Sequence, residues 1–217
     1  MKILGLEIEL LGHASVKIKN RKIIYIDPFQ LTEEKNLEKA DVILITHEHY
    51  DHCSPADMAK IAKPETIIIT IADCQSKLNK LKVKGIALIE SGKTISLGEE
   101  KVTAVPAYNI DKWRSKGVAF HPKENAWVGF IVDMNGVKVY HAGDTDFIPE
   151  MKDIDVDVAF LPVGGTYTMT ALEAAQATKT FKRCKLAIPM HYGGLVGSGS
   201  DAETFKSNAG CEVKILM

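Results

Sequence analysis

The first part of the chain alternates apolar and polar residues in the manner of β-strands. Residues 6–12 (LEIELLG), 14–19 (ASVKIK) and 22–29 (KIIYIDPF) show this two-residue period, and the polar run KNRK marks a turn between the last two. Such alternation predicts strands with one buried face. Residues 40–46 (ADVILIT) form a continuous apolar run instead, which predicts a strand buried on both faces.

Strands and helices then alternate along the rest of the chain. Residues 54–63 (SPADMAKIAK) have the apolar spacing of a helix, with Ser54 as N-cap and Pro55 at the first helical position. Asn135-Gly136 predicts a hairpin between two alternating strands. Further helices are predicted at 72–81, 170–181 and 201–207, and further strands at 65–70, 84–90, 93–97, 101–107, 156–165, 185–191 and 211–216.

The two halves of the chain echo each other in the order of their elements. A hairpin over 16–27 ends at Asp27 and leads through a connector to the 40–46 strand. A second hairpin, over 130–144, ends at Asp144 and leads in the same way to another buried strand. This repeat predicts an α/β fold in which two sheet-and-helix halves pack face to face as a four-layer sandwich, within one domain over 1–217.

Composition narrows the function classes. The 217 residues carry a formal net charge of −1, which gives no electrostatic reason to expect nucleic acid or an anionic membrane as partner. No apolar run approaches the roughly 20 residues of a membrane-spanning helix, and Glu7 and Glu9 argue against a secretory leader. The four scattered cysteines lack CxxC spacing, so a reducing cytoplasm is expected. We expect a small-molecule substrate as partner and leave homo-oligomer formation open.

Candidate chemistry is concentrated where the 40–46 strand ends. Residues 47–52 (HEHYDH) hold three histidines and Asp51 in six positions, which suggests a metal site, a catalytic relay or a polar loop. A serine relay needs a nucleophile elbow, and no GxSxG occurs. A helical HExxH zinc motif is excluded, because Asp51 stands four residues after His47. Imidazole and carboxylate are the ligands of divalent metals, so metal binding is favoured, with room for two ions.

Six motifs spread along the chain carry a family resemblance. They are GHAS (12–15), IDPF (26–29), THEHYDH (46–52), HAGDTD (141–146), FLPVGGTYTM (160–169) and IPMHYG (188–193). In this order they resemble the metallo-β-lactamase-fold superfamily of metal-dependent hydrolases, and within it the UPF0173/ascorbate-phosphate-lactonase-like group. The resemblance implies an αββα sandwich and a metal-activated water acting on a small-molecule ester, lactone or phosphoester. It also implies one or two divalent ions, zinc being favoured and manganese, iron or nickel being the alternatives.

The resemblance implies particular residues for the site. Six metal ligands are implied: His47, His49, Asp51, His52, Asp144 and His191. His47 and His49 would hold the first ion, and Asp51 and His52 the second. Asp144 would bridge the two ions, and His191 would complete the second site. Asp27 would brace the loop that carries four of these ligands (residues 47–52, the ligand loop) by hydrogen bonds. Asp51 is expected also to orient the water or to accept its proton.

One departure from the family pattern concerns the first ion. The family supplies a further histidine from a strand between the two halves of the ligand set, and this chain has Tyr108 and Asn109 there. His121, within the longest predicted irregular segment (106–126), could replace that ligand. Alternatively, the amide oxygen of Asn109 could bind weakly, or the protein could work with one ion.

Other residues are predicted to meet the substrate. His13, at a predicted hairpin tip, is expected to hang over the site and contact the substrate. Thr166 and Tyr167 are expected to form part of the pocket wall. His121 and Tyr167 are the candidates for protonating the leaving group.

Two other functions stay open at this level. One is nuclease or phosphodiesterase activity, which the lack of an extra clamping domain and of basic surplus disfavours. The other is a metal-binding protein without turnover, which the missing histidine makes worth testing.

Overall fold

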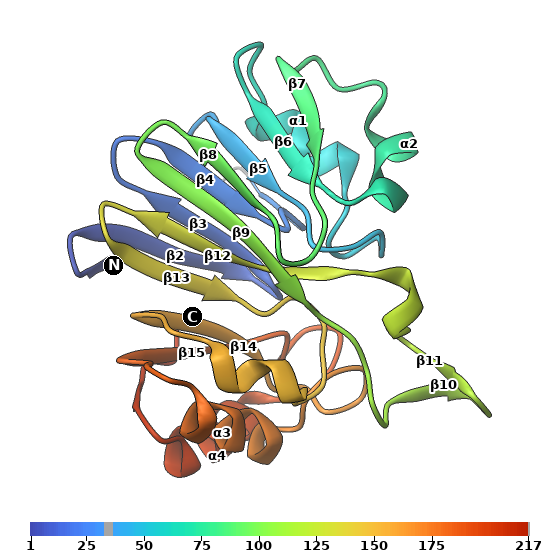
Figure 1. Ribbon diagram of the computed structural model, residues 1–217, viewed down its shortest axis with the longest axis vertical. Coiled ribbons are helices and arrows are strands. Elements are labelled where there is room, and N and C mark those ends of the chain that lie inside the picture. Colours follow the sequence, from blue (N-terminus) through green and yellow to red (C-terminus); the bar gives the residue numbers. More distant parts are fainter. Residues whose placement is uncertain (33–36, 217) are drawn as a thin grey trace. The chain divides into compact units, whose positions relative to one another are not determined.

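The computed structural model describes residues 1–32 and 37–216. The chain divides into two compact units, Met1–Ile89 and Glu90–Leu216. Among the described residues, each unit holds one seven-stranded mixed sheet and two α-helices (Figure 1). The predicted α/β class with two β-sheets is therefore confirmed, whereas the extent of a single domain over 1–217 stays a prediction.

The strands of the first unit follow chain order across their sheet. The first three pairings are antiparallel and the last three are parallel. The strands are β1 (Lys2–Ile3), β2 (Leu6–Gly12), β3 (Ser15–Lys19), β4 (Ile23–Ile26), β5 (Val42–Leu44), β6 (Ile67–Thr70) and β7 (Gly85–Leu88). Every residue of β5 is buried, as the continuous apolar run predicted.

The helices of the first unit connect its parallel strands. α1 (Pro55–Ile61) begins where predicted, because the Ser54 hydroxyl accepts a hydrogen bond from the Asp57 amide and Pro55 occupies the first turn. The helix predicted over 72–81 is shorter in the structure, which has a 3-10 turn η1 (Ala72–Cys74) followed by α2 (Gln75–Leu78). Neither of these elements has a side-chain N-cap, so the segment lacks the start signal that stabilises longer helices.

The second unit repeats the strand pattern of the first. Its sheet order is β16-β15-β14-β13-β12-β9-β8, and from β8 onward three antiparallel pairings again precede three parallel ones. The strands are β8 (Thr94–Leu97), β9 (Glu100–Pro106), β12 (Val128–Met134), β13 (Val137–His141), β14 (Val158–Pro162), β15 (Leu186–Met190) and β16 (Glu212–Val213). Asn135 and Gly136 both have positive φ (56° and 80°), as a type I′ hairpin turn requires.

Two helices pack beside the parallel strands of the second unit. α3 (Ala171–Thr180) and α4 (Gly199–Asn208) lie side by side and contact β14 and β15, respectively (Figure 1). Thr170 closes a capping box with Glu173 at the start of α3. The 3-10 turn η3 (Pro149–Asp153) lies between β13 and β14 in the chain. No helix among the described residues combines the length and apolar character that a membrane span requires.

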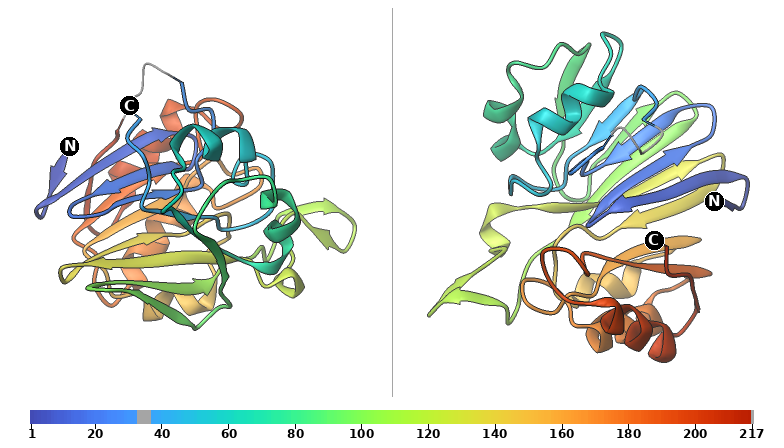
Figure 2. Two further views of the ribbon diagram at one scale, coloured as in Figure 1. Left: turned by 90° about the horizontal axis from the view of Figure 1, so that it is seen from above. Right: turned by 180° about the vertical axis from the view of Figure 1, so that it is seen from behind.

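The irregular segment predicted over 106–126 is partly structured. It contains the hairpin of β10 (Trp113–Ser115) and β11 (Val118–Ala119) and the 3-10 turn η2 (Lys123–Asn125). Gly117, with φ 78°, allows the tight turn between the two short strands. The hairpin projects away from the rest of the second unit (Figure 2).

Candidate metal centre

In the first unit, Asp27 lies beneath the ligand loop that follows β5. Because β4 and β5 are parallel neighbours, the residues after them meet at one edge of the sheet. The fully buried Asp27 carboxylate accepts hydrogen bonds from the Thr46 amide (2.8 Å) and hydroxyl (2.6 Å). The same carboxylate lies 2.7 Å from Nδ1 of His52. Asp27 adopts a left-handed backbone with φ 47°, a strain that such buried contacts offset.

These contacts define which nitrogen His47 and His52 present. A carboxylate only accepts, so Nδ1 of His52 carries the proton that faces Asp27. The Thr46 hydroxyl gives its own proton to Asp27, so it accepts from Nδ1 of His47 at 2.9 Å. In the neutral form of both rings, Nε2 therefore carries the lone pair. Both side chains are buried, with 1% of His47 and none of His52 exposed.

His49 joins His47 at the start of the loop. Nδ1 of His49 lies 3.1 Å from Nε2 of His47, and their rings meet nearly at right angles. Two atoms that each lie about 2.0–2.2 Å from one ion are roughly 3 Å apart. The spacing of this pair therefore suits two ligands of one metal ion.

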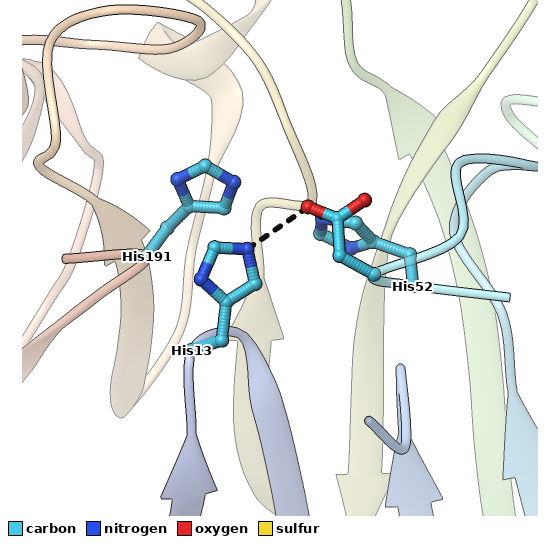
Figure 3. Close-up of side chains that lie close together, drawn as sticks. His13, His52 and His191 are labelled. Atoms are coloured by element: carbon cyan, nitrogen blue, oxygen red, sulfur yellow. Dashed lines mark hydrogen bonds and ion pairs between the residues drawn. The ribbon is translucent and has the colours of Figure 1, made fainter. Parts of the chain in front are cut away.

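His13 contacts the aspartate of the ligand loop. It stands at the turn between β2 and β3, with φ 49°, and its Nε2 lies 3.1 Å from Oδ2 of Asp51 (Figure 3). The ligand-type atoms of His13, Asp51 and His52 all lie within 4.8 Å of one another. His13 is thus an integral part of the cluster in the first unit, and its expected contact with substrate stays a prediction.

In the second unit, two histidines face one oxygen of Asp144. Asp144 follows β13, and its Oδ2 lies 3.1 Å from Nε2 of His191 and 3.2 Å from Nε2 of His121. All three side chains are at most 3% exposed. Imidazole nitrogens and a carboxylate oxygen this close together are the ligand types that divalent ions bind.

Close backbone packing holds His191 at this point. His191 directly follows β15 with φ 58° (Figure 3). Gly164, after the neighbouring strand β14, approaches so closely that an added Cβ would lie 2.5 Å from the His191 carbonyl oxygen. Glycine is therefore required there for His191 to keep its place.

Asn109 contacts His121 through both backbone and side chain. Its Oδ1 accepts hydrogen bonds from the His121 amide and from Nδ1 of the ring, each at 2.8 Å. Its Nδ2 donates to Oδ1 of Asp146 (3.0 Å) and to the Tyr167 carbonyl (2.9 Å). Because the amide oxygen already accepts two hydrogen bonds, it has no lone pair left for a metal. The structure therefore argues against the alternative in which Asn109 itself is the ligand.

The segment around Asn109 is anchored to the turn that carries Asp144. Asp146 accepts hydrogen bonds from the amides of Ile110 (2.6 Å) and Asp111 (2.9 Å), and its own amide donates to the Tyr108 carbonyl. The Tyr108 hydroxyl donates to Glu150. Burial raises the pKa of Tyr108, an effect that Lys123 opposes and Glu150 increases. The strand-end tyrosine thus serves as an anchor.

The remaining predicted residues lie on the loop between β14 and α3. The Tyr167 ring is partly exposed and packs edge-on against Phe120 at 4.7 Å. Thr166 is exposed on the same loop. Sequence reasoning missed Thr46 and Asp146. Their only signal was adjacency, since Thr46 precedes His47 and Asp146 ends the GDTD motif.

The donor set of both units fits a divalent metal. It consists of buried imidazole nitrogens and carboxylate oxygens, and the neighbouring polar groups orient the rings as in known metal sites. The contact between Nε2 of His121 and Asp144 points the same way. With its Nδ1 proton directed to Asn109, the neutral form of the ring presents the Nε2 lone pair to the carboxylate. A cation held between Nε2 of His121 and the Asp144 carboxylate would stabilise both acceptors.

Comparison with known proteins identifies the family. A family model described as the beta-lactamase superfamily domain matches residues 7–191. The chain belongs to this superfamily. The hydrolase is also 32% identical to a UPF0173 metal-dependent hydrolase of Pyrococcus abyssi, over 97% of this chain and 95% of the relative. A UPF0173 metal-dependent hydrolase of Methanoregula boonei is 37% identical, over 91% and 86% of the two chains.

A solved structure supports the same assignment. The crystal structure of a Parabacteroides distasonis protein, provisionally classed as a metal-dependent hydrolase, is 38% identical with a TM-score of 0.82. It matches 98% of this chain, and the match covers 94% of that structure. The predicted class, a metal-dependent hydrolase of the metallo-β-lactamase superfamily, is thereby confirmed.

Proposed function

We propose that this hydrolase uses one or two divalent ions, with zinc favoured, to cleave a small-molecule ester, lactone or phosphoester with water. The observation that carries the proposal is Oδ2 of Asp144, which lies 3.1–3.2 Å from two imidazole nitrogens. The same ligand chemistry recurs around Asp51 in the first unit.

The proposed ligand set follows the family resemblance. It comprises the six implied ligands and, in place of the missing family histidine, His121: His47, His49, Asp51, His52, His121, Asp144 and His191. His47 and His49 are assigned to one ion because their facing nitrogens are 3.1 Å apart. By the family resemblance, His52 and His191 would hold the other ion, and Asp144 would be the bridge.

The chain's own groups prepare the water and the leaving group. A divalent ion, when bound, would lower the pKa of the attacking water and stabilise the negative charge that develops on the substrate oxygen. Asp51 is proposed to accept the proton of the water, and His13, at 3.1 Å, holds the orientation of its carboxylate. Tyr167 is kept as the proposed proton donor. His121 is assigned to metal binding instead of proton donation, because Asn109 and Asp144 engage both its nitrogens.

Metal content and hydrolysis test this proposal together. The purified protein should contain at least one equivalent of a transition metal, and it should hydrolyse members of a panel of p-nitrophenyl esters, lactones and bis-p-nitrophenyl phosphate. Asp144→Ala and His191→Ala should each abolish hydrolysis. The control Asp153→Ala removes an exposed carboxylate that pairs with Lys182 and should leave the rates unchanged.

Three outcomes would reject parts of the proposal. Protein that neither contains nor takes up metal contradicts the hydrolase mechanism altogether. Bound metal without turnover on any substrate would favour a metal-binding protein. Unchanged rates in Asp144→Ala and His191→Ala would remove the assignment of this site.

A further inference from the structure

The position at which the family supplies a histidine holds Asn109, and its contacts give it a definite role. We propose that Asn109 is a positioning residue that orients His121 as a metal ligand, and that Asp146 in turn orients Asn109. The inference rests on the proposed function, because it concerns the ion that Asp144 would hold. It assigns a task to Asn109 and Asp146, which lie outside the proposed ligand set.

The orientation of the Asn109 amide follows from its partners. Asp146 Oδ1 and the Tyr167 carbonyl can only accept, so the nitrogen of the amide faces them. The His121 backbone amide can only donate, so the oxygen faces His121. These three partners exclude the flipped amide. Its nitrogen would face the His121 amide, which is also a donor, and its oxygen would face Asp146 and the Tyr167 carbonyl, which are also acceptors.

The fixed amide oxygen then selects the form of the His121 ring. Oδ1 of Asn109 accepts from Nδ1 of His121 at 2.8 Å, so that nitrogen carries a proton. In the neutral ring, Nε2 then carries the lone pair that can bind a metal, and it lies 3.2 Å from Oδ2 of Asp144. The His121 ring also meets Trp127 edge-on at 5.6 Å, which limits its rotation. The chain of contacts runs from Asp146 through Asn109 and His121 to Asp144.

The backbone of the loop is closed at the same two residues. The Asn109 amide donates to the His121 carbonyl at 2.8 Å, and the His121 amide donates to Oδ1 of Asn109. The intervening residues, which include the β10–β11 hairpin, therefore leave and return at one point. Asn109 lies just after β9 and holds the returning segment, which carries the His121 imidazole.

The repeated sheet topology supports this reading independently. His13 lies between the second and third strands of its sheet, and His121 lies between β9 and β12, the second and third strands of the other. Each presents Nε2 to an aspartate, at 3.1 Å for His13 and 3.2 Å for His121. His121 thus has the sheet position that already carries a site histidine in the first unit.

A double-mutant cycle in zinc affinity tests the proposal. Zn²⁺ binding to the full chain is measured by competition with a chromophoric chelator for wild type, Asn109→Ala, His121→Ala and the double variant. Loss of a group that orients a ligand weakens metal binding about 10–100-fold, and we expect this for Asn109→Ala. The double variant should bind no more weakly than His121→Ala, because Asn109 acts through His121. Asn208→Ala, a helix-end amide, is the matched control.

An isosteric exchange separates positioning from a general structural role. Asn109→Asp keeps the acceptor for His121 but sets two carboxylates 3.0 Å apart, the present distance from Nδ2 of Asn109 to Asp146. Adding Asp146→Asn restores a donor–acceptor pair without changing the charge of the two together. We expect the double exchange to bind zinc at least tenfold more tightly than Asn109→Asp alone.

The position of the His121 ring gives a readout that needs no metal. In crystal structures of metal-free protein, Asn109→Ala should release the ring from its contact with Asp144. A ring that stays in place, zinc affinity equal to wild type, or additive losses in the double variant would each overturn the inference. Wild-type protein that binds no metal would reject the proposed function, while the ring position would still decide whether Asn109 positions His121.

Discussion

The two units orient a histidine with different partners at nearly the same distance. In the first unit the Asp27 carboxylate lies 2.7 Å from Nδ1 of His52. In the second unit the Asn109 amide oxygen lies 2.8 Å from Nδ1 of His121. Both contacts direct Nε2 away from the partner. The geometry is shared, whereas the charge is not.

This difference separates orientation from electronic support. A carboxylate partner both fixes an imidazole and strengthens it as a metal donor, whereas a neutral amide fixes it without adding charge. Asp27 also accepts two hydrogen bonds from Thr46, so the whole contiguous loop depends on it. Asn109 needs Asp146 to hold its own orientation. The histidine held by the neutral group should therefore be the easier one to disturb with little effect on the fold.

Replacing the charged partner should have the largest effect. Asp27→Asn gives the first unit a neutral partner like that of the second, but it turns an amide nitrogen toward a buried donor. Hydrogen bonds to a charged group contribute about 1.5–3 kcal/mol each, so we expect the free energy of unfolding to fall by about 3 kcal/mol. Urea denaturation measures this, with Asp153→Asn as the exposed control. A loss below about 1 kcal/mol would mean that the charge of Asp27 has little importance for the loop.

A close backbone contact should come next in effect. Gly164→Ala places a Cβ 2.5 Å from the His191 carbonyl oxygen, and the backbone must move. Such overpacking costs about 1–3 kcal/mol, and the displaced His191 should reduce hydrolysis at least tenfold. Gly85→Ala, whose added Cβ meets nothing within 4 Å, is the control and should retain both stability and activity. Normal hydrolysis by Gly164→Ala would show that His191 tolerates displacement.

The contrast also explains what the sequence could reveal. The proposed ligands of the first unit stand within six consecutive positions after a buried strand, so periodicity and spacing alone predicted a metal site there. The strand pattern likewise predicted both sheets and their repeated order, because alternation is a local property. Asp144 and His191 lie at separate strand ends, where only the resemblance to a family suggested that they act together.

The role of Asn109 could not be read from its neighbours in the chain. It depends on which way the amide points, and Asp146, 37 residues later, decides that. It depends also on the return of the chain at His121, after a hairpin that the sequence pattern did not predict. These are tertiary facts, so the sequence supported three alternatives at this position, and the structure argues against one of them, the binding of a metal by Asn109 itself.

Acid titration should show whether the two units unfold together. Burial alone would raise the pKa of Asp57 in the first unit, but hydrogen bonds from Lys60, Ser54 and the Leu31 amide outweigh it and lower the pKa. The folded state therefore binds fewer protons than the unfolded state. The stabilisation is complete above the ordinary aspartate pKa of about 3.9 and is lost as the pH falls below it. Asp57→Asn should remove this dependence and cost about 1 kcal/mol at neutral pH.

Both tryptophans, Trp113 and Trp127, belong to the second unit, so their fluorescence reports on the unit that Asp57 does not occupy. If the chain unfolds as one domain, Asp57→Asn should shift the fluorescence transition and the circular-dichroism transition by the same amount. A fluorescence transition that stays unchanged would contradict the prediction of one domain. It would mean that the two units unfold separately.

The smallest effect is expected at His141, the one histidine outside the proposed ligands, their orienting contacts and the cluster around Asp51. It ends β13, its Nδ1 accepts a hydrogen bond from the Gly143 amide at 3.2 Å, and its ring lies nearly parallel to Phe160. His141→Gln keeps an acceptor near Gly143, so it should cost about 1 kcal/mol of stability and change zinc affinity less than twofold. The matched change His191→Gln should abolish tight binding. A large loss of zinc affinity in His141→Gln would mean that a residue within β13 supports the proposed ligands of the second unit, in addition to Asn109. The two units would then differ in the number of supporting contacts as well as in the charge of the partner.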